Sequence, residues 1–506
     1  MTSLREIVAQ GRRIEAHRPW PRVVVTAEGW SAAADELAGG RATLLGLWGE
    51  SGVPGVVHMA AITEDDNEIA VVSLECPLQT FPSVGALHPP AIRLERAIHS
   101  LHGLKPVGAA DTRPWLDLGF WDVEFPLGTR LPAANPRPAY DFLPVEGENL
   151  HRIPVGPVHA GIIEPGHFRF TCAGETVARL EQRLGYVHKG IDSLMAGATI
   201  DRAAKLAART SGDSTVAYGV AFARAVEAAL DIEVPARANY LRALMAELER
   251  LANHFGDIGA ICNDASFAIM HAHCGVLREQ VLRAADACFG HRLMMDRVVP
   301  GGVAVDLRAD APAILQAALK IFRQRFPRLV ELYDNTASLQ DRTVSTGIVR
   351  PDYAKQFGAP GYVGRASGRA FDARKAIAYA PYDALDFTVP VLNAGDVNAR
   401  VWIRIHEVEQ SFALIEQIIA RLPNGPITTP VDSSNNNGEG LGFAEGFRGD
   451  VLAAVRLENG RVAHCHLRDP SWFQWPLLET AIEGNIVADF PLCNKSFNCS
   501  YSGHDL

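Results

Sequence analysis

The chain has 506 residues, a formal net charge of −10 and 48% hydrophobic residues. This length suffices for more than one hydrophobic core, and an acidic chain without a block of Lys and Arg argues against nucleic-acid and anionic-membrane partners. No run approaches the roughly 20 apolar residues that a membrane helix needs, and the N-terminus lacks the apolar stretch of a signal peptide. The sequence therefore predicts a cytoplasmic protein that meets a membrane only through partner proteins.

Residues 1–145 are predicted to form a small α+β domain. A helix is expected over residues 92–101, because Gly103 and Pro106 follow it as stop signals. A proline-rich connector, Leu131–Pro138, marks the predicted domain boundary, since proline fixes φ and withholds a backbone donor. Three short apolar runs separated by Gly, Pro, Asp and Asn are typical of strands: 42–48, 55–62 and 68–74.

Residues 146–506 are predicted to form a mainly α-helical bundle with peripheral β-hairpins. Apolar residues recur at helical spacing after Pro235, and a later stripe ends at Pro423. The stretch 428–442 is rich in Ser, Asn and Gly, and we expect it to be a mobile loop. Four helices are expected in all, over residues 235–255, 276–289, 311–333 and 401–422.

The eight cysteines are scattered, without any C-x-x-C pair, as expected for single buried thiols in a cytosolic protein. Cys493 and Cys499 are the only close pair. His464-Cys465-His466 has the composition of a ligand cluster, but alternation along a strand would point the two histidines away from the cysteine. We therefore expect a strand without a metal at this place.

A polar break between two predicted helices begins at Arg209. It resembles the Arg-x-Cys-Gly-x-Cys-x-x-x-His motif of the large subunits of nickel–iron hydrogenases. The arginine and the glycine of that motif are present as Arg209 and Gly212. Both cysteines are replaced by serines, Ser211 and Ser214, and Tyr218 stands at the histidine position.

Two further stretches carry the motifs of one superfamily. Ile153–Phe170 contains Gly-Pro-x-His and Pro-Gly-His-Phe-Arg, and Arg183–Asp192 contains Gly-Tyr-x-His-Lys-Gly. These motifs are similar to those of membrane-bound, energy-converting hydrogenases of the formate hydrogenlyase type (hydrogenase-4 component G-like) and of the D subunit of NADH-quinone oxidoreductase (complex I). From the residues alone, the alternative is a β-hairpin that leads into a helix with hydrogen-bonded histidines.

Other segments extend this resemblance over most of the chain. Leu94–Leu104, followed by Asp111–Pro114, resembles the motif of the C subunit of complex I more loosely. A C-like half joined to a D-like half is the layout of the formate hydrogenlyase large subunit. Arg365–Gly368 with Asp372–Arg374, and later Glu445–Gly449, resemble Arg-Ala-Ser-Gly, Asp-x-Arg and Glu-x-x-Arg-Gly of the same superfamily.

The resemblance implies a nickel–iron site held by four cysteine thiolates, yet none of the four is present. The ligand positions are occupied by Ser211, Ser214, Ser500 and Gly503. Serine hydroxyls stay protonated near neutral pH and are hard, poor substitutes for thiolates. We therefore expect neither nickel nor active-site iron. Because trimming of the C-terminus in these hydrogenases follows nickel insertion, we also expect the mature chain to end at Leu506.

In complex I, the cavity that corresponds to the nickel–iron site of the hydrogenases receives a quinone head group. This makes quinone a candidate ligand. Asp264 falls where the D subunit has the aspartate that partners its quinone-binding histidine, and Arg209 where it has the arginine beside the terminal iron–sulfur cluster. Two replacements argue against a quinone site. Gly212 stands where the D subunit has its quinone-binding tyrosine, and Met294 stands where it has a histidine beside the cluster. Either His159 or His167 is the candidate that could stand in for the missing histidine.

The implied site and partners follow from this alignment. His159, His167, Asp192, Asp264 and Arg209 are expected to line one cavity and to move protons, with Arg209 and Gly212 near a partner's cluster. The alternative is a satisfied polar network that only joins helices. No cofactor is expected on this chain. The expected partners are an iron–sulfur small subunit that carries a [4Fe-4S] cluster and is similar to the B subunit of complex I, a ferredoxin-like subunit and antiporter-like membrane subunits.

Three functions remain open from the sequence. The first is a metal-free, hydrogenase-like large subunit that couples electron transfer to ion translocation, at the inner face of the plasma membrane. The second is a non-catalytic scaffold of the same kind of complex. The third is a redox-inactive or zinc-binding cytosolic protein outside any such complex.

Overall fold

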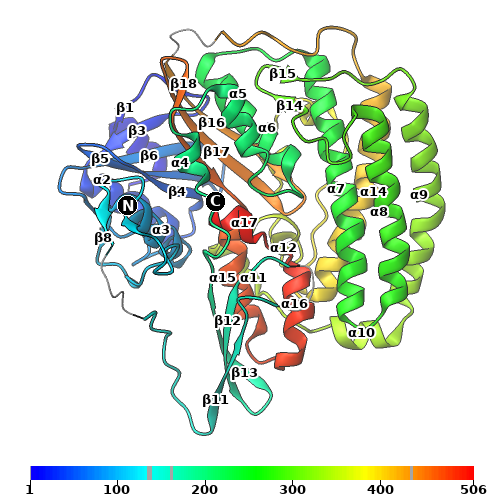
Figure 1. Ribbon diagram of the computed structural model, residues 1–506, viewed down its shortest axis with the longest axis horizontal. Helices are drawn as coiled ribbons and strands as arrows, with labels where there is room; N and C mark the ends of the chain where they lie inside the picture. Colours follow the sequence, from blue (N-terminus) through cyan, green and yellow to red (C-terminus); the bar gives the residue numbers. More distant parts are fainter. Residues whose placement is uncertain (1, 134–138, 160–162, 433–436) are drawn as a thin grey trace.

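The computed structural model describes residues 2–133, 139–159, 163–432 and 437–506. Parts of three predicted segments lie outside these residues: the end of the proline-rich connector, residues 160–162 of the stretch 159–167 that carries His159 and His167 (here called the histidine loop), and residues 433–436 of the predicted mobile loop. Helices and sheets are mixed, as predicted for an α+β protein (Figure 1). In the described part of the chain, no helix is both long enough and apolar enough to cross a membrane.

The N-terminal part is a five-stranded sheet with helices packed on it. The strand order is β1-β3-β6-β5-β4, and only the pair β3 and β6 is parallel. The three strands and the helix predicted here are confirmed, and Gly103 ends the helix in the left-handed region at φ 75°. The elements are α1 (Leu4–Gln10), β1 (Arg12–Arg13), β3 (Arg22–Val25), α2 (Ala27–Ala38), β4 (Ala42–Glu50), β5 (Gly55–Thr63), β6 (Ile69–Cys76), β7 (Thr80–Pro82), α3 (Ile92–His102) and β8 (Lys105–Val107).

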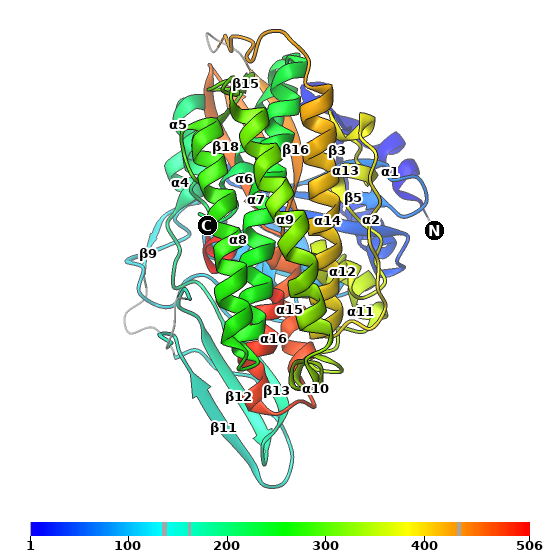
Figure 2. The ribbon, with the colours of Figure 1, turned by 90° about the vertical axis from the view of Figure 1, so that its right-hand side faces the viewer.

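A three-stranded antiparallel sheet projects from the molecule at the bottom of Figures 1 and 2. It consists of β11 (Leu150–Val155), β12 (His167–Ala173) and β13 (Thr176–Arg183). Its inward side chains Phe168 and Phe170 pack against Phe490, with ring centroids 4.8 and 4.9 Å apart. The histidine loop connects β11 to β12, so this aromatic contact fixes the base of the loop against the C-terminal helices.

Four long helices form the bundle on the right of Figure 1 and face the viewer in Figure 2. They are α7 (Ala236–Asp264), α8 (Ala268–Phe289), α9 (Ala311–Asp334) and α14 (Val397–Arg421), so all four predicted helices are confirmed. Phe255 of α7 contacts Phe322 and Phe326 of α9 at centroid distances of 5.6 and 5.3 Å, and Phe412 of α14 at 6.4 Å. Apolar residues at helical spacing thus form the core of the bundle.

A buried sheet lies between the bundle and the N-terminal part. It consists of β16 (Gly438–Gly446), β17 (Gly449–Glu458) and β18 (Arg461–Arg468), with β2 (His17–Arg18) parallel to β16 at its edge. Nearly all residues of β16 and β17 are buried, so the prediction of peripheral hairpins is wrong for this sheet. On β18, His466 stacks on Trp48 of the N-terminal sheet while Cys465 belongs to the core, which is the predicted alternation.

The prediction of a mobile loop over residues 428–442 is wrong for its last five residues, because residues 438–442 begin β16. Gly438, Gly440 and Gly442 face α6 (Thr215–Leu230), and a Cβ on any of them would clash with the backbone carbonyl oxygens of Ala229, Ala225 and Ala221. The glycines therefore permit close packing of an alanine-rich helix on a strand. Composition alone does not distinguish this use of glycine from a loop.

The remaining helices connect these layers. The C-terminal helices α15–α17 lie buried at the centre of the molecule, below the β16–β18 sheet in Figure 1. The division of the chain near residue 145 stays a prediction. The other described elements are β9 (Val123–Glu124), β10 (Leu131–Pro132), α4 (Ile191–Met195), α5 (Ile200–Ala207), β14 (Val298–Val299), β15 (Gly302–Val303), α10 (Ala337–Thr343), α11 (Pro351–Gln356), α12 (Gly361–Arg365), α13 (Ala373–Ala376), α15 (Ser471–Ile482), α16 (Phe490–Phe497), α17 (Tyr501–Asp505) and three short 3-10 turns at Pro89–Ala91, Tyr382–Ala384 and Val487–Asp489.

Candidate functional site

The residues at three of the four thiolate positions meet in a serine cluster (Ser211, Ser214 and Ser500). The hydroxyl oxygens of Ser211 and Ser500 are 2.9 Å apart and share a hydrogen bond. Ser211 and Ser214 also donate to the carboxylate of Asp213, at 2.8 and 3.2 Å. All three serines are buried, so these hydrogen bonds replace the water that the hydroxyls would otherwise bind.

The fourth thiolate position, Gly503, lies beside the serine cluster but leaves no room for a side chain. Its backbone N–H donates to Ser500 Oγ at 2.9 Å. A Cβ at this position would clash with Asp469 Oδ2. The same Oδ2 accepts a hydrogen bond of 2.7 Å from the hydroxyl of Tyr218, the residue at the histidine position. A buried tyrosine–aspartate pair therefore fills the space next to the fourth position.

These residues do not fit a nickel–iron centre. Such a centre needs soft thiolates, whereas this place offers hydroxyls that are already bonded to each other, and a glycine with no space for a cysteine. The nearest thiol in sequence, Cys499, is buried and donates toward Gln474 Oε1 at 3.8 Å. Among the described residues, no group of three or more His, Cys, Asp and Glu is arranged to hold a metal ion.

An ion pair lies beside the serine cluster. Arg448 donates to Asp213 through both Nη atoms, at 2.8 and 2.6 Å, and one of them also reaches Ser214 Oγ at 3.3 Å. Burial raises the pKa of Asp213, but the guanidinium and the two serine hydroxyls outweigh it and lower this pKa to about 2. The Asp213 carboxylate therefore stays ionised, and a fixed positive charge lies behind it.

A cavity of about 260 Å³, here called the large cavity, opens next to this ion pair. Its lining includes Gly212 and Asp213 of the helix break and Met294 from the segment that follows α8. The volume is far above the 10–15 Å³ that one water molecule requires, so the cavity can hold several waters or a small ring. The other lining residues are Leu248, Glu249, Ala252, Asn253, Arg278, Val281, Leu282, Ala285, Arg292 and Leu293.

Glu249 is the second carboxyl of the large cavity. Its oxygens accept hydrogen bonds from the backbone N–H groups of Val216 and Ala217, at 2.7 and 3.1 Å, at the start of α6. Burial raises the pKa of Glu249 to about 8, with Asp213 adding to the rise and the two backbone donors opposing it. One cavity thus contains a carboxylate that stays ionised and a carboxyl that holds a proton near neutral pH, a pair suited to proton transfer.

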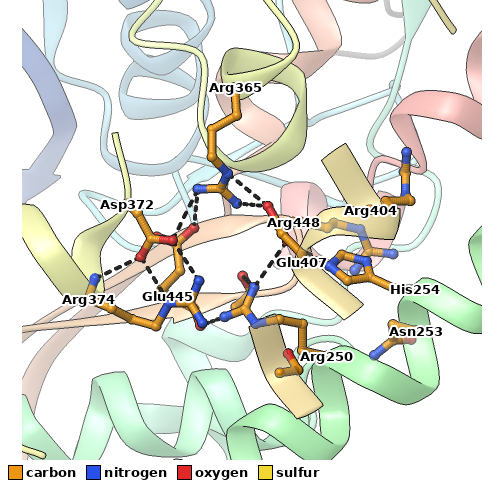
Figure 3. Close-up of polar contacts among 12 residues, drawn as sticks. Arg250, Asn253, His254, Arg365, Asp372, Arg374, Arg404, Glu407, Glu445 and Arg448 are labelled. Atoms are coloured by element: carbon orange, nitrogen blue, oxygen red, sulfur yellow. Dashed lines mark hydrogen bonds and ion pairs between the residues drawn. The ribbon is translucent and has the colours of Figure 1, made fainter. Parts of the chain in front are cut away.

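Several residues of the predicted superfamily motifs form a buried charge cluster, drawn in Figure 3. Arg365 donates to Glu407 at 2.8 Å and to Glu445 at 3.0 Å, and His254 contacts the other oxygen of Glu407 at 2.7 Å. Burial opposes ionisation of Glu407, but Arg365 and His254 outweigh it and hold its pKa well below the usual range. The cluster joins α7, α12, α14 and β16, as expected for a network that fixes the core.

The two candidate histidines lie in the histidine loop and not in the serine cluster. His159 Nε2 contacts the carbonyl oxygen of Gly166 at 2.8 Å, and His167 Nδ1 contacts that of Gly156 at 3.4 Å. Burial lowers the pKa of His167. The loop does reach the C-terminal segment, two residues beyond Ser500, through Glu164, whose carboxylate accepts a 3.0 Å hydrogen bond from the backbone of Ser502.

The other three candidate residues, Arg209, Asp264 and Asp192, are not part of the lining of the large cavity. Arg209 forms a two-pronged ion pair with Asp296, at 2.6 and 2.7 Å, with 42% of its side chain exposed. Asp264 ends α7, where burial raises its pKa and Lys495 opposes the rise. Asp192 is in α4 beside Cys465; burial raises its pKa to about 7, and its Oδ1 has no hydrogen-bond partner among the described residues.

Of the candidate residues, only Gly212 lines the large cavity. The sequence did not identify Asp213, Glu249 or Asp469. Asp213 lay inside the motif and could have been found from its position between the two serines. Glu249 directly follows Leu248 of the apolar stripe, where helical spacing predicts a solvent-exposed side chain. The sequence pattern therefore gave no sign that this carboxyl is buried.

The helix break before α6 and the C-terminal segment meet inside the protein, at the hydrogen bond between Ser211 and Ser500. Residues 264–436 match the family model described as the 49 Kd subunit of respiratory-chain NADH dehydrogenase. The chain is 30% identical to formate hydrogenlyase subunit 5 of Escherichia coli (strain K12) over 86% of this chain and 78% of that protein. It is 28% identical to the C/D subunit of NADH-quinone oxidoreductase of Phocaeicola vulgatus, over 81% and 84% of the two chains.

The chain belongs to the family that joins the large subunits of formate hydrogenlyase-type hydrogenases with the 49 Kd and D subunits of NADH-quinone oxidoreductase. Its relatives include hydrogenase-4 component G of Escherichia coli (strain K12), 30% identical over 84% of this chain and 76% of that protein. In fold, it is similar to a chain of the membrane-bound sulfane sulfur reductase, an archaeal respiratory membrane complex. The TM-score is 0.67 at 24% identity, over 72% of this chain and all of that chain.

Proposed function

We propose that this protein is a metal-free, hydrogenase-like large subunit of a membrane-associated oxidoreductase related to complex I. The observation that carries the proposal is the serine cluster. The frame of a hydrogenase site is retained, with the helix break and the C-terminal segment still in contact between Ser211 and Ser500. Hydroxyls and the Tyr218–Asp469 pair occupy the place of thiolates, so this frame holds no nickel–iron centre.

The large cavity supports a role in proton-coupled electron transfer. It lies against the helix break and contains Asp213 and Glu249, whose pKa values are about 2 and about 8. Carboxyls with separated pKa values in one cavity suit the transfer of a proton to a bound acceptor. Quinone is the candidate acceptor. A [4Fe-4S] cluster in a partner subunit would supply electrons, and Arg209 would face that partner and stabilise the reduced cluster by its fixed charge.

The proposed partners follow from the relatives, which are subunits of membrane-bound hydrogenases and complex I-like complexes. We propose an iron–sulfur small subunit as the direct partner, with ferredoxin-like and antiporter-like subunits in the same assembly. The chain would then lie on the cytoplasmic face of the plasma membrane, held there by its partners, and couple electron transfer to ion translocation.

A non-catalytic scaffold is the second candidate, and the charge cluster favours it. The side chains that match the superfamily motifs, Arg365, Arg374 and Glu445, pair with one another or with neighbouring acids deep in the core. A network of this kind joins helices and needs no substrate. In this alternative the large cavity binds no substrate and has no catalytic role.

Two substitutions in the assembled complex separate these functions. Glu249→Gln and Arg209→Met should each lower quinone-dependent or proton-coupled turnover at least several-fold while the subunits still copurify. Arg12→Met is the matched control, because Arg12 forms an exposed ion pair with Glu75, 2.6 Å long, far from the large cavity in the sequence. Unchanged turnover in both variants, with a complete complex, supports the scaffold and contradicts the coupling function.

A further inference from the structure

Two walls of the large cavity belong to a pair of antiparallel helices. α7 and α8 lie side by side in the bundle, and residues 265–267 connect them (Figures 1 and 2). Ala252 of α7 and Ala285 of α8 are in the lining, where each contributes only a methyl group. Most of the other lining residues are apolar, so the cavity between these helices suits an apolar body.

Arg278 brings a positive charge into this apolar lining. It belongs to the α8 wall, which Val281, Leu282 and Ala285 continue at helical spacing. The Arg278 side chain lies across α7 at Gly256, where an added Cβ would be 3.1 Å from Arg278 Cδ and 3.3 Å from Nε. The absence of a side chain at Gly256 therefore lets the half-buried arginine lie flat against the neighbouring helix.

The charge of Arg278 has no counter-charge in the part of the chain that the structure describes. No hydrogen bond or ion pair joins its guanidinium to a described residue. The other charged groups of the lining are compensated. Arg292 pairs with Glu279 at 3.0 Å, and Asp213 forms the buried ion pair described above. Glu249, with its pKa raised to about 8, is mostly neutral at pH 7. The lining is therefore positive at Arg278.

We propose that the large cavity binds an organic anion, with its apolar body between Ala252 and Ala285 and a carboxylate or sulfonate on the Arg278 guanidinium. The planar fork of N–H donors on a guanidinium matches two oxygens of such a group. Binding needs no bond to be made or broken. The inference deepens the proposed function, on which it rests in one respect: the acceptor in this cavity would be a quinone that carries an acidic group.

The matched probes 2-naphthoate and 2-naphthamide test the charge, because they have the same ring and differ in carboxylate against carboxamide. Calorimetric titration of the purified chain at pH 7 should show naphthoate binding about tenfold or more tightly, as a charge-assisted hydrogen bond implies. Arg278→Gln should bind the two probes equally, with the affinity for the amide unchanged. Equal binding by the wild type, or a preference that survives in Arg278→Gln, would overturn the proposal.

Arg325→Gln is the matched control for the charge. Arg325 is an exposed arginine of α9 that forms no ion pair with a described residue, so this variant should keep the wild-type preference for naphthoate. Loss of the preference in both arginine variants would mean that it depends on net charge and not on the cavity, and would contradict the assigned site.

A larger side chain in the cavity wall tests where the ring lies. Ala252→Leu should weaken both probes about tenfold or more, because its side chain occupies the place of the ring. Ala285→Leu, on the facing helix, takes its place if that variant does not fold. Unchanged affinities in a folded variant would contradict the site.

The same arginine variant separates ligand binding from subunit contact and from coupling. If Arg278→Gln binds naphthoate as the wild type does but the assembled complex loses a subunit, Arg278 belongs to a subunit contact and the proposal is wrong. The titrations need neither partner subunits nor turnover, so they can fail while the coupling function stands, and the reverse.

Discussion

Ser211 and Ser500 are 289 residues apart in the chain, and their hydroxyl oxygens share a hydrogen bond of 2.9 Å. In the hydrogenases that this chain resembles, both positions hold metal-binding thiolates. The hydrogen bond therefore joins the two segments directly. It also joins a network through Asp213 and Arg448 that fixes the helix break before α6.

Gly503→Ala should destabilise the protein, because the new Cβ would clash with Asp469 Oδ2 inside a closed network. An added carbon in a packed core costs about 1–3 kcal/mol, and we expect a loss of that size in the free energy of unfolding. Gly212→Ala is the matched control, since a Cβ there has no atom within 4 Å. Denaturant unfolding of both variants measures the difference. Equal free energies of unfolding for the two variants would contradict the conclusion that Asp469 leaves no room for a side chain at Gly503.

Arg448→Met should lower the free energy of unfolding by about 1–3 kcal/mol near neutral pH, because it leaves Asp213 without its charged partner. The pKa of Asp213 is about 2 in the folded chain and about 3.9 when unfolded, so its contribution is full above pH 4 and is lost as the pH falls toward 2. The difference in the free energy of unfolding between wild type and Arg448→Met should therefore become smaller from pH 6 to pH 3.

The control for this prediction is Arg308→Met, which removes an exposed ion pair with Asp310, with side chains 64% and 57% exposed. It should cost less than about 1 kcal/mol at every pH. A loss in Arg448→Met that is the same at pH 3 and pH 6 would contradict the assigned ion pair.

Glu249→Gln should change the pH dependence of stability in the opposite direction. The pKa of Glu249 is raised to about 8 in the folded chain and is about 4.3 when unfolded, so the folded state binds more protons between these values. Its contribution to stability is present at low pH and is lost as the pH rises through this window, by at most about 1.4 kcal/mol per pH unit.

Thermal unfolding of wild type and Glu249→Gln between pH 5 and pH 9 measures this effect. The stability of the glutamine variant relative to wild type should increase with pH, because glutamine needs no proton to remain neutral. Parallel curves for the two proteins would contradict the raised pKa of the Glu249 carboxyl in the large cavity.

The helices and the N-terminal strands were predictable because their signals are local. The stripe that passes through Leu244, Leu248 and Leu251 follows helical spacing, and Gly103 ends a helix in the only conformation that favours glycine. β16 was missed because its glycines carry no strand signal. They are required by α6, which lies more than 200 residues earlier in the sequence and packs on them.

For the site, the sequence predicted only those residues that lie at motif positions. The motifs located the serine cluster, whose members do meet, because two rigid segments of the fold hold those positions. They could not reveal Asp469 filling the space beside Gly503, or Glu249 capping α6, because both are contacts between distant segments. Nor could spacing along the chain reveal which candidates line a cavity. Asp192 packs beside Cys465 on β18, and Arg209 pairs with Asp296 on the exposed side.

The metal content of the complex isolated through this chain tests the central claim most directly. Because Ser211, Ser214, Ser500 and Gly503 provide no thiolate, we predict no stoichiometric nickel, and iron only in amounts that the iron–sulfur clusters of copurified partners explain. Elemental analysis, with hydrogen uptake measured on the same sample, gives the answer. One nickel per chain together with hydrogen uptake would contradict the account.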